Sequence, residues 1–205
     1  MKFLIKKNYI ILFVLAILLI QSKTFAKERT IQYTRENISN YFSGIISANQ
    51  DYNKKAFKHL KKVTSLKDRH TQFNIEFIRT LVQLEKFSQA FAFSKSIWRE
   101  DEFFLEIDLL LGLDYFVKKD YINAEKHFKR LNNVFRYNPF GIDDFISNIL
   151  IAWSKASQGN KEESFKFIEK IPNPYFHFKK IQNTFLQCYF DYDQTQESFK
   201  ELIHD

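Results

Sequence analysis

Three alanines recur at a constant spacing, and this period constrains the fold more than any other feature of the sequence. They are Ala56, Ala90 and Ala124, each thirty-four positions after the last. Gly44 and Gly112 are separated by twice this period, and each precedes its alanine by twelve positions. A unit of this length cannot bury its apolar face alone. The period therefore predicts a stack of similar units, each covering its neighbour.

The third period shows what one unit consists of. Residues 108–131 predict two amphipathic helices joined by a tight turn, because spacings of three and four place residues on one helical face. The residues on the two facing sides are Leu111, Gly112, Tyr115, Ala124, Phe128 and Leu131. The small residues allow the helix axes to approach closely, and the larger ones fill the remaining space. Asp120 lies at the expected turn, where its side chain can cap the second helix.

The period continues to the end of the chain with one interruption. Ser164, the next small residue in phase, follows Ala124 by one period plus six positions, and Ser198 follows Ser164 by one further period. This offset implies a six-residue insertion. The break at 137–141 and the adjoining Asp143 and Asp144 account for it. The predicted repeat domain covers 37–205, in units at about 37–70, 71–104, 105–138, 145–178 and 179–205.

These features resemble the tetratricopeptide repeat (TPR) family, whose 34-residue helix–turn–helix unit carries the same alternation of small and large residues. The third unit matches best and the others are degenerate. The family often has an aromatic residue four positions before the small residue of the first helix. Here those positions hold Asn40, Asn74, Asp108, Asn148 and Gln182. The resemblance implies an all-α fold, a right-handed superhelical stack of about five helix–turn–helix repeats. We assign nine residues to the packing between helices: Gly44, Ala56, Ala90, Gly112, Tyr115, Ala124, Phe128, Ser164 and Ser198.

The N-terminal segment has the features of a secretory signal peptide. Residues 1–7 contain three lysines, residues 9–20 are an unbroken apolar run, and Ala26 ends a small-residue cleavage site. The apolar run is shorter than the roughly 18 residues that span a bilayer. We therefore expect residues 1–26 to be a signal peptide and 27–36 a polar lead-in, with export to a bacterial periplasm. The alternative is an uncleaved segment that anchors the chain in the inner membrane.

The charge distribution argues against nucleic-acid binding. Four of the 31 basic residues lie in 1–26, which contains no acidic residue. The remainder has 27 basic and 24 acidic residues, a net charge of +3, and the two signs are interspersed. A solvated surface is expected from this distribution, whereas nucleic-acid binding favours a basic stripe. A helical-repeat RNA binder remains the less favoured alternative.

No motif predicts catalysis, a metal site or a cofactor. The five histidines have no metal-ligand spacing, and they are His59, His70, His127, His177 and His204. His59 and His127 occupy equivalent repeat positions, and we expect solvated or half-buried histidines. The one cysteine, Cys188, is expected to be a small buried apolar residue. With four glycines in total, the chain also lacks a phosphate-binding loop, a nucleophile elbow and an HExxH motif.

The resemblance implies that the first helix of each unit lines a concave groove that binds an extended peptide or a helix. Projection of the repeat gives two rows along this groove. One row is Tyr41, Ile75, Leu109, Ile149 and Asn183, and the other is Ile45, Arg79, Leu113, Trp153 and Gln187. The rows are mostly apolar, so they predict either a binding surface or a groove filled by its own side chains. Arg79 and Trp153 would be the strongest anchors, because Arg and Trp are enriched at binding hot spots.

The sequence thus predicts a non-enzymatic scaffold of the bacterial cell envelope that binds another protein in an apolar groove. The alternative is an accessory helical domain of a cell-wall-processing or secretion machine. The last predicted helix still carries apolar residues such as Phe199 and Leu202. A solenoid normally ends in a polar face, so this end is either a shortened array or a second contact surface.

Overall fold

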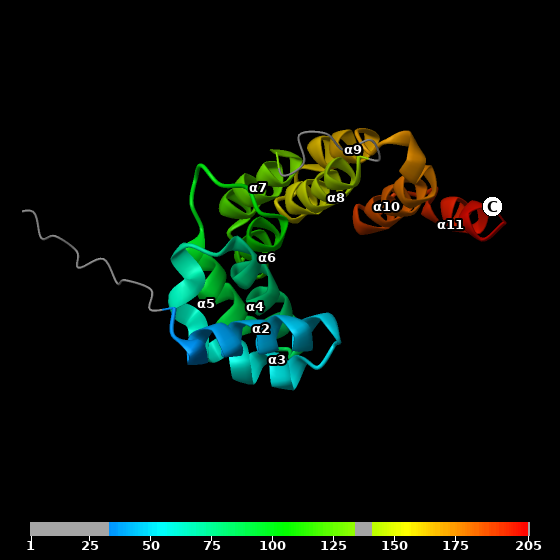
Figure 1. The fold of residues 1–205 in the computed structure, drawn as a ribbon. Helices are drawn as coiled ribbons and strands as arrows, with labels where there is room; N and C mark the ends of the chain where they lie inside the picture. Colours follow the sequence, from blue (N-terminus) through cyan, green and yellow to red (C-terminus); the bar gives the residue numbers. More distant parts are fainter. Residues whose placement is uncertain (1–32, 134–140, 205) are drawn as a thin grey trace, which may run out of the picture. The chain divides into compact units, whose positions relative to one another are not determined.

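The computed structural model describes residues 33–133 and 141–204. The predicted signal peptide, most of the lead-in and the break at 137–140 lie outside these residues. The described part contains ten α-helices and no β-strand. They form five hairpins in chain order: α2 (Arg35–Asn49) with α3 (Asn53–Leu60), α4 (Thr71–Gln83) with α5 (Phe87–Ile97), α6 (Leu105–Val117) with α7 (Tyr121–Arg130), α8 (Ile142–Ser157) with α9 (Lys161–Glu169), and α10 (Phe176–Tyr189) with α11 (Thr195–His204) (Figure 1).

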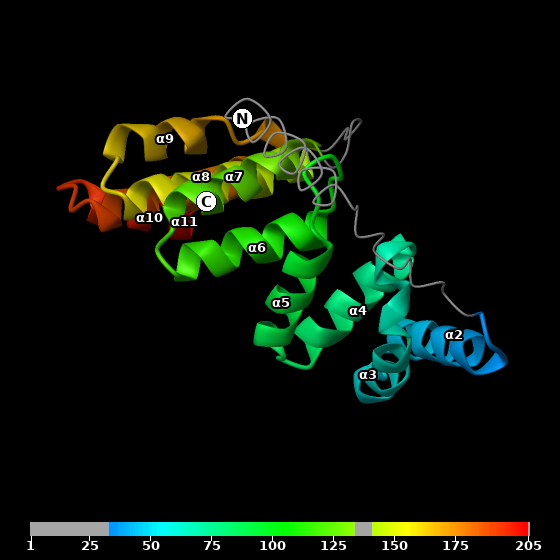
Figure 2. The same ribbon diagram turned by 90° about the vertical axis from the view of Figure 1, so that its left-hand side faces the viewer.

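Each hairpin packs against the next one in the chain. The second helix of one hairpin contacts the first helix of the following hairpin at α3–α4, α5–α6, α7–α8 and α9–α10. The first helices α2, α4 and α6 also contact one another in sequence. Figure 2 shows α4 and α5 as a hairpin that lies beside α6. The predicted all-α stack of five helix–turn–helix repeats is therefore confirmed.

Three short 3₁₀ segments join or extend the helices. They are η1 (Lys61–Asp68), η2 (Leu131–Asn133) and η3 (Asn173–Tyr175). The helix α3 ends at Leu60, and η1 continues the chain with a kink at Val63. In η3, Pro174 lies in the first turn, where its missing N–H leaves no hydrogen bond unmade.

One backbone motif closes all five hairpins. The residue after the C-cap of each first helix has a left-handed conformation, and these residues are Asp51, Glu85, Lys119, Gly159 and Asp191. Each donates its N–H to the carbonyl three positions back, and the next residue donates to the carbonyl five positions back. This is the Schellman motif, which satisfies the last carbonyls of a helix. Gly159 is the one glycine among the five, so four turns hold a side chain in a conformation that favours glycine.

The fifth hairpin is out of phase with the others. The left-handed residues of the first three turns are one period apart, and Gly159 follows one period plus six positions later. Asp191, however, comes two positions before the next full period is complete. The N–H of Ser198 nevertheless donates to the carbonyl of Gln194, as the N–H of Ala56 donates to the carbonyl of Tyr52. The helix α11 therefore keeps its phase in the repeat, whereas α10 ends two positions early. Asn183 and Gln187 are half-buried, like most residues of the two rows, and their place in the groove stays a prediction.

Small residues of one helix face large residues of the other inside the hairpins. A Cβ on Gly44 would overlap the side chain of Leu60, and one on Gly112 would overlap the ring of Phe128. The second hairpin reverses the sizes, with Ile78 at the glycine position. The residue at the opposing position is Ser94, which is fully buried. Of the remaining packing residues, Ala56, Ala90, Ala124 and Ser164 are fully buried, whereas Tyr115 and Ser198 are half-buried.

Candidate functional site

The eight candidate groove residues of the first four hairpins lie on the first helices. Seven of them are half-buried: Tyr41, Ile45, Ile75, Leu109, Leu113, Ile149 and Trp153. Arg79 is exposed. This face is thus neither wholly covered by its own side chains nor an open apolar surface. The contacts of these residues differ between the two ends of the face.

The rows on α6 and α8 are partly filled by the protein's own core. Leu109 and Leu113 pack against the cluster around Phe128. Ile149 and Trp153 pack against the cluster around Ala152. These side chains stabilise the hairpins through burial of apolar surface. They present only part of their surface to a partner.

Trp153 is held by the fifth hairpin. Its Nε1 donates to Gln182 Oε1 at 2.7 Å, and its ring lies edge-on to Tyr189 at 5.8 Å between centroids. Phe185 and Tyr189, both on α10, are exposed, at 46% and 52%. The exposed aromatic surface at this end of the face therefore belongs to α10 rather than to the predicted anchor Trp153.

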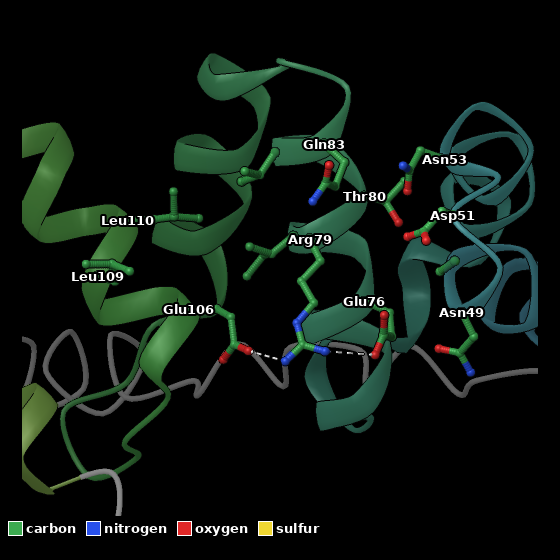
Figure 3. A pocket seen from close by; sticks show the side chains of 13 residues that line it. Asn49, Asp51, Asn53, Glu76, Arg79, Thr80, Gln83, Glu106, Leu109 and Leu110 are labelled. Carbon is green, nitrogen blue, oxygen red and sulfur yellow. Dashed lines mark hydrogen bonds and ion pairs between the residues drawn. The ribbon is translucent and has the colours of Figure 1, made fainter. Parts of the chain in front are cut away.

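A cleft of about 500 Å³ opens beside the other predicted anchor, Arg79 (Figure 3). It runs along α4, with the end of α2 and Asp51 on one side and the first turns of α6 on the other. Arg79 Nη2 lies 2.7 Å from Glu106 Oε1 on α6, and its Nη1 lies 3.4 Å from Glu76 Oε1 on α4. Glu76 is itself buried and accepts a 2.8 Å hydrogen bond from Gln72. Arg79 thus lies between two carboxylates on the surface of the groove.

The cleft combines charged and apolar lining residues, whereas the sequence predicts a mostly apolar groove at this point. The sequence prediction omits Glu76 and Glu106 because they lie outside the projected rows. Each precedes a row residue, Arg79 or Leu109, by three positions, and therefore lies one helical turn away on the same face. Rows that also counted the residue one helical turn before each row residue would include both Glu76 and Glu106. A neighbouring cleft of about 660 Å³ shares Asp51 and also has lysine residues in its lining.

A buried polar cluster lies between α5, α6 and α7. Asp108 Oδ1 accepts hydrogen bonds from Arg130 Nε at 2.8 Å and from Trp98 Nε1 at 3.1 Å, and it lies 2.8 Å from His127 Nδ1. The Arg130 guanidinium also bonds three backbone carbonyls at residues 99, 100 and 102. His127 is buried, so the expectation of a solvated or half-buried side chain is wrong for it and holds for His59. The cluster ties the α5–α6 connection to the third hairpin.

Two carboxyl groups in the described part of the chain have shifted pKa values. Burial alone would raise the pKa of Glu125, but hydrogen bonds from Gln158 and Lys155, the charge of Lys155 and a bond from Lys129 lower it below its ordinary value. Burial raises the pKa of Asp144 at the start of α8, and the charge of Asp143 adds to the effect. Neither group lines the cleft beside Arg79.

Metal ligands do not come together in the described part of the chain. Among residues 33–133 and 141–204, no three His, Cys, Asp or Glu side chains are grouped so that they could hold an ion. Cys188 on α10 is exposed, so the prediction of a buried apolar role is wrong. None of the helices within these ranges is both long and apolar enough to span a membrane.

Comparisons with known proteins give a fold without a sequence family. No protein-family model matches the chain, and no curated protein matches it in sequence. A crystal structure of MamA protein has a similar fold, with a TM-score of 0.63 and 16% identity over 82% of this chain and 91% of that one. MamA from Desulfovibrio magneticus RS-1, from position 41 to its end, gives a TM-score of 0.65 and 12% identity over 84% of this chain and 96% of its own. The chain therefore has the TPR-like helix-hairpin fold found in these structures.

Proposed function

We propose that this chain is an exported, non-enzymatic scaffold that binds another polypeptide along the face of its first helices. The observation that carries the proposal is the composition of that face. Half-buried apolar side chains run along α2, α4, α6 and α8, with an open charged cleft at α4 and exposed aromatic residues at α10. Protein interfaces combine an apolar centre with polar and charged surroundings in this way.

Charge favours a polypeptide over a nucleic acid as the partner. Of the residues that line the cleft, Asp51, Glu76 and Glu106 are acidic and Arg79 is basic. The excess of carboxylates would repel a phosphate backbone, which nucleic-acid-binding proteins attract with Lys and Arg. An RNA-binding role would require salt-sensitive binding of single-stranded RNA.

The second candidate function is that of an accessory domain in a cell-wall-processing or secretion machine. The exposed aromatic residues on α10 favour it, because exposed apolar patches mark interaction sites. A docking surface at this end would leave the α4 cleft free for another chain. The identity of the crosslinked partner distinguishes this candidate from a free-standing scaffold.

We propose a periplasmic location on the basis of the N-terminal sequence. The three lysines, the short apolar run and the small-residue site before Lys27 favour cleavage after Ala26. Cell fractionation, followed by N-terminal sequencing of the protein, tests this proposal. A chain that retains residues 1–26 in the membrane fraction would support the anchored alternative.

Site-specific photo-crosslinking in the native host tests the binding face. A photoreactive amino acid would replace Gln83 in the cleft or Phe185 on α10, and the control would replace Ile122, which is 79% exposed on the second helix α7. We expect the two face positions to crosslink the same polypeptide, identified by mass spectrometry, and position 122 not to do so. Equal crosslinking from position 122 would exclude a specific face. Crosslinks to RNA would favour the RNA-binding alternative.

A further inference from the structure

We infer that the cleft beside Arg79 receives a positively charged side chain, lysine or arginine, of the bound polypeptide. The inference rests on the proposed function and specifies the chemistry of the partner. It follows from the charges that line the cleft, the ends of two helices, a buried hydroxyl group and the size of the space.

The charges around the cleft are not balanced. Arg79 pairs with both Glu76 and Glu106, so a single positive charge serves two carboxylates. Asp51 also lines the cleft and forms no ion pair within the described residues. The lining therefore carries two more negative than positive charges, which favours a cationic ligand group.

Two helices direct their C-terminal ends at the same cleft. Asn49 ends α2 and Gln83 ends α4, and both line the cleft. The C-terminus of a helix carries a partial negative charge and is stabilised by nearby cations. Neither helix has a basic residue in its last turn. Neither helix therefore supplies a cation to this end from its own last turn.

Thr80 provides an independent sign of a missing ligand. It lines the cleft, is 1% exposed, and its Oγ1 has no hydrogen-bond partner among the described residues. Figure 3 shows its side chain on the side of α4 that faces Asp51 and Asn53. A buried hydroxyl without a partner is unfavourable, and an ammonium or guanidinium group offers the donor that this oxygen lacks.

The size of the cleft suits such a side chain. Its volume of about 500 Å³ lies within the range of small-ligand pockets. Ile78, Leu109 and Leu110 contribute apolar surface to the lining. Lysine and arginine bury their methylene stems against apolar surface while the charged end reaches polar groups. The two carboxylates beside Arg79 then supply the polar end of the site.

Binding of short peptides to the full chain tests this inference. The probes are blocked pentapeptides, acetyl-Ala-Ala-Xaa-Ala-Ala-amide, with Xaa as lysine, arginine, norleucine or glutamate. Dissociation constants are measured by ligand-observed NMR at low salt. We expect the lysine and arginine peptides to bind at least about tenfold more tightly than the norleucine peptide, which corresponds to about 1.4 kcal/mol. The glutamate peptide should bind most weakly.

Matched variants identify the groups responsible. Glu106→Gln and Asp51→Asn should each weaken binding of the lysine peptide several-fold, whereas Glu162→Gln, on the exposed first turn of α9, should leave it unchanged. Arg79→Gln should tighten lysine binding, because it removes the competing cation. Circular dichroism checks that each variant is folded. Tightest binding of the glutamate peptide, with loss of binding in Arg79→Gln, would show an anion site and overturn the inference. Equal binding of norleucine and lysine, or no binding of any peptide, would also overturn it.

The crosslinking experiment distinguishes failure of this inference from failure of the proposed function. If the face positions crosslink a polypeptide but Glu106→Gln changes neither peptide binding nor crosslinking, the binding face stands and the cationic site does not. If the lysine peptide binds but neither Gln83 nor Phe185 crosslinks a polypeptide, the cationic site stands and the scaffold proposal does not.

Discussion

Gly112 lies directly against the ring of Phe128, and a Cβ on the glycine would overlap that ring. The contact joins the middle of α6 to α7 and belongs to the core of the third hairpin. The second hairpin has the sizes exchanged at the equivalent positions, Ile78 and Ser94. The combined size of the two side chains at this crossing thus matters more than which helix carries the larger one.

Exchanging the sizes in the third hairpin should therefore restore part of the stability that each single change removes. Gly112→Ile alone overpacks the crossing and should cost about 1–3 kcal/mol of unfolding free energy. Phe128→Ser alone leaves a cavity and should cost about 3–5 kcal/mol. We expect the double variant to be at least about 1 kcal/mol more stable than the sum of the two losses predicts. Urea denaturation of the four proteins measures this coupling.

The control for this cycle combines Gly112→Ile with Val117→Ser. Val117 is exposed at the end of α6, so the two changes should add without coupling. Strict additivity of Gly112→Ile and Phe128→Ser would show that the two positions do not share one packing volume.

The turn between α6 and α7 offers a stabilising change. Lys119 has a φ of +62°, a conformation that favours glycine. Lys119→Gly should raise the free energy of unfolding by about 0.5–1 kcal/mol, because relief of the left-handed strain exceeds the entropy cost of glycine. Val117→Gly, two positions earlier within the helix, should lower it by a similar amount. Thermal denaturation of both variants checks the difference in sign, and a loss of stability in Lys119→Gly would contradict the strain argument.

The helix pairs were predictable because the period arises from backbone approach. Only small residues fit where two helix axes come close, so Ala56, Ala90 and Ala124 mark those points in the sequence. The phase of α10 was not predictable in this way. Ser198 keeps the phase of the second helices, whereas the shift by two positions lies in the turn at Asp191, whose left-handed conformation has no glycine to mark it.

The candidate site was predictable only in part, since the projection used one residue per turn. It placed Arg79 on the groove face but omitted Glu76 and Glu106, which determine the charge around it. Trp153 was placed on the same face, yet its partner Gln182 lies on the next hairpin and contributes to filling the groove. A single repeat position does not show whether a neighbouring unit already occupies a side chain.

Repeat positions also pair polar residues in a way that the sequence prediction does not include. His59 Nδ1 lies 3.0 Å from Asn40 Oδ1, and His127 Nδ1 lies 2.8 Å from Asp108 Oδ1. The two pairs have the same separation in sequence and occupy equivalent places in the first and third hairpins. The polar residues that replace the family's aromatic position therefore pair with histidine in two hairpins.

The pair with the carboxylate of Asp108 should contribute far more to the free energy of unfolding than the pair with the amide of Asn40. Asp108→Ala leaves the buried guanidinium of Arg130 without its carboxylate and should cost about 3–5 kcal/mol. Asn40→Ala removes one part-buried hydrogen bond to His59 and should cost about 1 kcal/mol. Chemical denaturation of the two variants gives the comparison.

Loss of Asp108 should also loosen the α5–α6 connection. Arg130 holds the carbonyls of Arg99, Glu100 and Glu102, and the carboxylate orients its guanidinium. Amide hydrogen exchange should become faster over residues 98–104 in Asp108→Ala and stay unchanged there in Asn40→Ala. Equal stability losses in the two variants would argue against an ionic role for the cluster.

Glu125 links the third and fourth hairpins, and its contribution should depend on pH. It lies on α7, and its Oε1 lies 2.8 Å from Gln158 Nε2 and 3.0 Å from Lys155 Nζ, at the C-terminal end of α8. These partners hold the pKa of Glu125 below its ordinary value of 4.5 in spite of burial. Because the folded pKa is the lower one, the stabilisation is complete above the ordinary value and is lost as the pH falls through the folded pKa.

Glu125→Gln should therefore be less stable than the unmodified chain at pH 7, by about 1 kcal/mol, and the difference should shrink as the pH falls below 4.5. Glu162→Gln, at an exposed position of α9, provides a control that lacks the interhelix contacts. Urea denaturation between pH 3 and pH 7 measures both differences. A gap that is constant over this range, or one that widens in acid, would show that the charge of Glu125 does not join the two hairpins.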